Sequence, residues 1–211
     1  MTRFASLKDE FSFMRGNVLV LAVTLIIVNF MSAIPFTFYA KYVEELGGTP
    51  FIVGIIGFAS FVILALVQFP GGYLADKRGR RWLTVAMTFG VAVTYCFYAV
   101  SPSWHFIFVA AVLQNLCFIY QPALVALMAD SIPTERLGIG FSIFTIAFYI
   151  SAPSPIIAGI LSVQYGLVSG MRIAYLMVAV SLVAVALMRT EVLRFLVIKL
   201  FLPFRIIWAY S

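Results

Sequence analysis

The feature that most constrains this chain is the length of its uncharged apolar stretches. From Trp82 to Ala129, 48 consecutive residues carry no charge, and the stretches Gly16 to Ala40, Leu46 to Ala75 and Leu137 to Met171 contain 25, 30 and 35. One helix crosses about 30 Å of hydrocarbon with about 20 residues. A buried strand or a core helix of a soluble protein needs far fewer. The sequence therefore indicates an integral membrane protein.

The composition agrees with this interpretation and excludes other classes. Apolar residues make up 64% of the chain and charged residues 10%, whereas soluble domains average about 45–50% and about 25%. The net charge of +6 is typical of basic residues at a cytoplasmic membrane rim, and without a basic patch interleaved with aromatics we expect no nucleic-acid partner. Motifs for catalysis, cofactors or metals are absent. We therefore expect no enzyme, no cofactor and no metal site.

Charges and the loop signal Ser101-Pro102-Ser103 divide the chain into six predicted helices. We expect an all-α membrane protein whose spans lie at about residues 17–40, 51–74, 82–100, 105–129, 140–162 and 169–188. The predicted organisation has three parts: a tail at 1–16, a six-helix bundle at 17–188 and a basic segment at 189–211.

Lysine and arginine concentrate on one side of these predicted spans. Only Lys41 and Arg172 fall on the other side. The remaining 12 of the 14 basic residues are Arg3, Lys8, Arg15, Lys77, Arg78, Arg80, Arg81, Arg136, Arg189, Arg194, Lys199 and Arg205. Cytoplasmic loops carry an excess of basic residues, so we expect both termini in the cytoplasm and the protein in the cell (plasma) membrane.

The segment after the sixth predicted helix is apolar but interrupted by charges. At 100° per residue, Glu191, Arg194, Lys199 and Arg205 fall within an arc of about 140°. This pattern favours an amphipathic helix at the membrane surface, and its basic face suits anionic headgroups of the lipid bilayer. We expect Pro203 to kink or end this helix.

The most informative motif follows the second predicted helix. We expect Gly72 to let a neighbouring helix approach closely and Gly79 to adopt the left-handed backbone of a tight reversal. Asp76 is the one acid of this basic loop, and it gains most by facing a helix N-terminus or an arginine.

Gly72 to Arg81 reads G-x-L-A-D-x-x-G-R-R, which resembles the signature loop of the major facilitator superfamily. Weaker matches flank it at Pro35, Tyr39, Leu46-Gly47 and Gly54, and at Pro122 to Asp130 followed by Pro133, Glu135 and Arg136. The resemblance covers about residues 16–190. It implies one six-helix half of a twelve-helix transporter, built from 3+3 inverted repeats, which moves a small organic solute by alternating access.

The resemblance also implies a gating role for the loop. In the family the motif aspartate faces a helix of the other half, and a motif arginine can pair with an acid at the end of helix 4; Asp76, Arg80 and Asp130 occupy these places. The predicted gating motif comprises Gly72, Asp76, Gly79, Arg80, Arg81 and Asp130. The alternative is that these basic residues only anchor lipid headgroups.

The fifth predicted helix contains a second, partial resemblance. Ser154, Pro155 and Gly159 belong to a segment similar to the G-P-x-x-G-G motif of drug:proton antiporters, which favours efflux. The same small residues around a proline also suit a packing seam, so a hinge and a seam both stay open. The predicted spans have no charge at mid-depth, and the arginine of the family's helix 4 motif R-x-x-q-G is absent. Both points argue against proton antiport through this half.

A few polar side chains within the predicted spans are the candidates for substrate binding, because polar groups avoid lipid. The candidates are Asn29, Ser32, Gln114, Asn115, Gln121 and Tyr149. By the family's layout, helices 1, 2, 4 and 5 line the cavity, where these residues fall. Each of them could instead make an interhelical hydrogen bond.

Two functions follow from these patterns. The first is a transporter half that needs a homodimer partner or a separate second half, or that is a truncated product. The second is a six-helix scaffold that binds partners without transport. Mass and solute flux of the purified protein separate the two.

Overall fold

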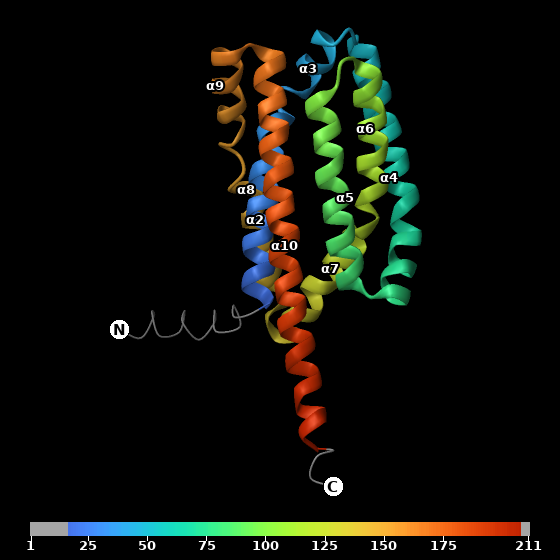
Figure 1. The fold of residues 1–211 in the computed structure, drawn as a ribbon, viewed down its shortest axis with the longest axis vertical. Helices are drawn as coiled ribbons and strands as arrows, with labels where there is room; N and C mark the ends of the chain where they lie inside the picture. Colours follow the sequence, from blue (N-terminus) through green and yellow to red (C-terminus); the bar gives the residue numbers. More distant parts are fainter. Residues whose placement is uncertain (1–16, 208–211) are drawn as a thin grey trace, which may run out of the picture.

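The structure, a computed structural model, describes residues 17–207 and the side chains of 19–142 and 145–190. These residues form helices and turns without a strand (Figure 1). The helices are α2 (Asn17–Phe36), α3 (Tyr39–Glu45), α4 (Pro50–Arg78), α5 (Arg80–Val100), α6 (Trp104–Cys117), α7 (Gln121–Ser131), α8 (Leu137–Tyr149), α9 (Pro155–Tyr165) and α10 (Leu167–Ile207), with the short 3-10 turns η1 (Phe118–Tyr120) and η2 (Thr134–Arg136).

Five stretches of the described chain are long and apolar enough to cross a membrane. They are Leu19–Phe36, Pro50–Arg78, Arg80–Val100, Trp104–Ser131 (α6, η1 and α7 in succession) and Leu167–Thr190. Each coincides with one predicted span, so the prediction of an all-helical membrane protein is confirmed.

The prediction of one continuous helix over 140–162 is wrong. Helix α8 ends at Tyr149, a turn occupies residues 150–154, and α9 begins at Pro155. Pro153 and Pro155 each lack an N–H and clash with the preceding helical turn, and proline suits the first position of a new helix. The small residues around the prolines tolerate the resulting turn.

The ends of the outer helices also differ from the prediction. Helix α2 stops at Phe36, next to Pro35, and not near residue 40. Helix α10 runs without a break from Leu167 to Ile207, so residue 188 is no boundary and Pro203 does not end the helix. The predicted tail at 1–16 lies outside the described residues. The contact of 189–211 with the membrane surface stays a prediction.

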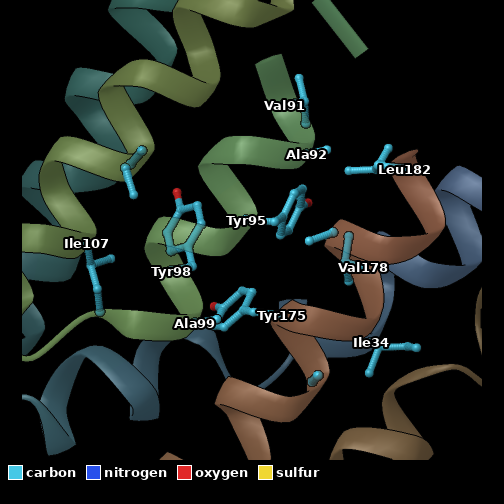
Figure 2. Packing of buried hydrophobic residues seen from close by; sticks show 14 of the residues in the cluster. Ile34, Val91, Ala92, Tyr95, Tyr98, Ala99, Ile107, Tyr175, Val178 and Leu182 are labelled. Atoms are coloured by element: carbon cyan, nitrogen blue, oxygen red, sulfur yellow. The ribbon is translucent and has the colours of Figure 1, made fainter. Parts of the chain in front are cut away.

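Helices α5 and α10 pack extensively against each other inside the bundle, while the C-terminal part of α10 runs out beyond it (Figure 1). Their contact is filled by Val91 and Ala92 from α5 and by Val178 and Leu182 from α10, all nearly fully buried (Figure 2). Helices α2 and α9 cover α10, and α6 covers α5. Small side chains at the contact let the helix axes come close, which is how helices associate in lipid.

Arg189, which the prediction grouped with the basic segment 189–211, lies inside this bundle. Only 5% of the residue is exposed. Its Nη1 donates a hydrogen bond to Oγ1 of Thr88 on α5 at 3.0 Å, and it also contacts the Tyr120 hydroxyl. Among the described side chains no carboxylate pairs with it, and its Nε has no hydrogen-bond partner.

A glycine lets α4 come close to η1, but it is Gly71 and not the predicted Gly72. A methyl group added at Gly71 would overlap the carbonyl of Ile119. A methyl group added at Gly72 would meet nothing within 4 Å in this chain. The motif indicated a close approach correctly but placed it one residue too late.

We therefore predict that Gly71→Ala destabilises the protein by about 1–3 kcal/mol, because the added methyl must push η1 away from α4. Gly72→Ala is the matched control and should leave the melting temperature in detergent unchanged. Equal melting temperatures for the two variants would contradict the prediction.

We predict opposite effects on stability when either partner of the hydrogen bond between Arg189 and Thr88 is replaced by an apolar residue. Thr88→Val removes a hydrogen-bond acceptor of the cation and should lower stability by about 1–3 kcal/mol. Arg189→Met removes the buried charge itself and should be neutral or stabilising, as for other buried charges replaced by apolar side chains. Thermal unfolding of both variants measures this, and a larger loss in Arg189→Met would refute it.

Candidate functional site

A pocket of about 230 Å³ opens between α2, α4 and α6. Its polar lining comes from Ser32 on α2, Ser60 on α4, and Gln114 and Asn115 on α6. The inner wall is aromatic and comes from α5 and α10, the two helices at the centre of the bundle. The lining contains no Asp, Glu, Lys or Arg.

The structure brings three of the six predicted cavity residues together. Ser32, Gln114 and Asn115 line the pocket. The Asn115 Nδ2 donates to the Ala111 carbonyl at 2.8 Å, which fixes this buried side chain on its own helix.

The other three predicted cavity residues lie elsewhere. The Asn29 Nδ2 donates to the Leu25 carbonyl at 2.9 Å, within α2. Gln121 accepts a hydrogen bond at 3.0 Å from Gln68 and so ties α7 to α4. Tyr149 is 69% exposed at the end of α8.

Tyrosines form the inner wall of the pocket, and the tyrosines of this wall are not among the predicted cavity residues. Tyr95 and Tyr98 come from α5 and Tyr175 from α10 (Figure 2). The rings of Tyr98 and Tyr175 are stacked with centroids 5.1 Å apart, and the Tyr98 hydroxyl donates to Oε1 of Gln114 at 3.2 Å. Three-residue spacing of Tyr95 and Tyr98 was the available signal, but the apolar count treated both as lipid-compatible residues.

The motif loop joins three helix ends through one arginine. Arg80, the first residue of α5, donates from Nη1 to Oδ2 of Asp130 at 2.6 Å and from Nη2 to Oδ1 of Asp76 at 3.4 Å. Asp76 lies near the end of α4 and Asp130 near the end of α7. All three side chains are exposed to solvent in part, by 37% for Arg80, 70% for Asp76 and 61% for Asp130. The 2.6 Å bond is therefore the main contact of this cluster.

The rest of the loop has the geometry of a tight reversal. Gly79 adopts a φ of +95°, in the left-handed region predicted for it. The cations of Lys77 and Arg78 lie 5.8 and 6.0 Å from the ring centroids of Tyr73 and Trp82, while Arg81 is half-buried. Cations over aromatic rings stabilise such interfacial positions by about 0.5–1 kcal/mol.

The turn between α8 and α9 keeps its polar groups bonded. Ser154 is fully buried, and its hydroxyl donates to the Ser151 carbonyl at 2.7 Å, while Pro155 opens α9. Gly159 faces the ring of Phe38 across a second, apolar groove. The predicted hinge residues thus lie at or beside a real interruption of the helix.

Within the described chain no group of three or more His, Cys, Asp and Glu residues could hold a metal ion. His105 is exposed and stacks on Trp104 with ring centroids 3.6 Å apart. The pocket itself offers rings, amides and hydroxyls for non-covalent binding.

Comparison with known proteins identifies the family. The family model described as Major Facilitator Superfamily matches residues 19–199. The protein YqjV of Bacillus subtilis (strain 168), described as an uncharacterized MFS-type transporter, is 30% identical over 95 residues, which cover 44% of this chain and 23% of that protein. The match therefore spans about a quarter of the relative's length, and no solved structure matches. Since the family model covers most of the 211 residues, the chain belongs to the major facilitator superfamily.

Proposed function

We propose that this chain is a six-helix half of a transporter that moves a small organic solute across the plasma membrane by alternating access. The observation that carries the proposal is the Arg80 cluster, because one side chain bonds the ends of α4 and α7 at the signature loop. Such a cluster can hold one arrangement of helices and release it when the bonds break.

The pattern of helix contacts supports the proposed 3+3 inverted repeats. We number α2, α4 and α5 as spans one to three, the α6–α7 run as span four, α8 with α9 as span five, and α10 as span six. Exchanging one with four, two with five and three with six then converts the α2–α10 contact into α6–α5, α9–α10 into α4–α5, and α2–α8 into α6–α4. The contacts α5–α10 and α2–α7 convert into themselves. This symmetry favours the fold of a transporter half.

The charge distribution supports the proposed orientation. If α8 and α9 count as one interrupted span, the resulting six spans put both ends of the chain on the side that carries most of the basic residues. We propose that this side is the cytoplasm and that Lys77, Arg78 and Arg81 meet anionic headgroups there.

We propose efflux as the direction, on the resemblance of the segment from Ser154 to Gly159 to an antiporter motif. The uncharged lining of the pocket favours a neutral or amphipathic solute, and coupling to an ion would then reside in the second half. The proposed partner is such a half or a second copy of this chain.

We predict that Asp130→Asn changes the balance of outward-open and inward-open states by up to about fivefold. The variant loses the ion pair with Arg80, and partly exposed pairs contribute about 0.2–1 kcal/mol. The measurement is thiol labelling of Ser60→Cys in the pocket, in a background with Cys96→Ala and Cys117→Ala. Glu44→Gln, an exposed acid on α3, is the matched control. Unchanged labelling and transport in Asp130→Asn would contradict the gating role.

Asp76→Asn should act through the partner half. Its contact with Arg80 is long and solvent-exposed, so the effect within this chain should be small. In the assembled transporter we expect the variant to shift labelling away from the outward-open state. An equal shift in the isolated chain would contradict this assignment.

The mass of the purified complex in detergent tests the proposed partner and the alternative of a scaffold. We predict a protein mass above the 23.4 kDa of one chain, together with solute flux in proteoliposomes. A solute screen in cells supplies the candidates for the flux assay. A strict monomer that moves none of them would refute the transporter and favour the scaffold.

A further inference from the structure

The pocket between α2, α4 and α6 extends to the two central helices of this half. Its wall includes Tyr95 and Tyr98 on α5 and Tyr175 on α10, so a solute in it would contact the two central helices. At about 230 Å³ it is smaller than the roughly 300–1,000 Å³ of pockets for drug-sized ligands. The space suits a solute of one or two fused rings.

The inner wall favours an aromatic solute. Tyr98 and Tyr175 stack at an interplanar angle of 19°, and Tyr95 lies 5.9 Å from the first ring and 6.1 Å from the second. Figure 2 shows these rings gathered between α5 and α10. The three residues line the pocket although at most 8% of each is exposed, so a further ring would meet only the part of their surface that the pocket reaches, in the offset or edge-to-face packing that tyrosine prefers.

The two amides on α6 give the pocket a polar edge. The oxygen of Gln114 accepts from the Tyr98 hydroxyl, and its amide also contacts the Tyr95 side chain, which leaves one N–H of the amide nitrogen as a donor for a solute. The Asn115 nitrogen is bonded to its own helix, which leaves the amide oxygen as an acceptor. The wall can therefore bond a solute that carries a hydrogen-bond acceptor, a donor, or both.

Charge decides between a neutral solute and an organic cation. Tyrosine faces attract cations, but recognition of a desolvated cation gains most from a carboxylate, and the lining has none. Nor does the lining have a Lys or Arg for an anion. From these observations we propose that the pocket binds an uncharged heteroaromatic solute of one or two rings that accepts a hydrogen bond from Gln114. This inference rests on the proposed transporter and names the substrate class of its site.

The test uses quinoline, a neutral two-ring acceptor, and N-methylquinolinium, its cation of nearly the same shape. Binding of each radiolabelled probe is measured at equilibrium on the full chain in lipid nanodiscs, with empty nanodiscs subtracted. We expect saturable binding of quinoline and at least about fivefold weaker binding of the cation. Binding of quinoline no greater than to empty nanodiscs, or a preference for the cation, overturns the proposal.

Two glycines of α4 supply a matched pair of variants. A side chain at Gly57 grows from the lining of the pocket, and one at Gly54 grows one turn earlier, outside it; neither added methyl meets an atom within 4 Å. Gly57→Leu should weaken quinoline binding by at least about tenfold, and Gly54→Leu should not change it. Equal affinities for the two variants overturn the proposed location.

Gln114→Glu tests the hydrogen bond and the charge selectivity. The carboxylate can still accept from Tyr98, but it loses the amide donor and adds a negative charge. We expect about fivefold weaker binding of quinoline and tighter binding of N-methylquinolinium. Unchanged affinities for both probes would refute the role of Gln114.

The failure of this inference is distinguishable from that of the proposed function. Equilibrium binding can be measured without transport. If the chain binds quinoline as described but moves no solute, the binding inference stands and the proposed transporter is refuted. If the protein transports other solutes but binds no quinoline, the proposed transporter stands and the binding inference is refuted.

Discussion

Backbone hydrogen bonding without water is the constraint on which this structure depends. Inside a bilayer each N–H and C=O must find a partner within the protein, which leaves helices as the only solution for an open chain. The break in the fifth span obeys the same rule. The backbone N–H groups of Ser151, Ala152 and Ser154 donate to carbonyls three residues earlier, at 3.2, 3.1 and 3.0 Å. Because its backbone groups stay bonded, this turn can lie at membrane depth and act as a joint.

The same constraint decides how the helices bind one another. Hydroxyls of the bundle mostly donate to carbonyls of their own helix, as Thr84, Thr94 and Ser101 do. Polar links between helices are consequently few in the described part of the chain, and Arg189 to Thr88 and Arg172 to the Ser101 carbonyl are two of them. Close packing of small side chains therefore carries most of the association, and single added methyl groups at such contacts are costly.

How far the sequence could predict this structure depends on which interaction decides each feature. Uncharged length decides where a span lies; it predicted six spans, and five of them coincide with described stretches that are long and apolar enough to cross a membrane. Hydropathy does not register missing N–H groups, so it missed the break before Pro155. A count of basic residues does not separate buried from exposed ones, so it grouped Arg189 with the basic segment. A motif does not fix how a helix is rotated about its axis, so the prediction placed the close contact at Gly72, whereas the structure has it at Gly71. The tyrosine wall was missed because tyrosine counts as apolar, although its position is decided by packing between distant segments.

Helix α5 connects the candidate gate at Arg80 with the candidate solute pocket. Its first residue, Arg80, bonds Asp130, and its last turns carry Tyr95 and Tyr98, 15 and 18 residues later. At 1.5 Å per residue the tyrosines lie about 22 and 27 Å from the start of the helix. Helix α5 packs extensively on α10, so we expect it to move as a rigid element. In the proposed gate, loss of the ion pair removes one restraint on the start of α5, and any tilt of α5 that follows would displace the pocket wall at the other end. Coupling of gate and pocket then requires only this rigid helix and no chain of intermediate side-chain changes.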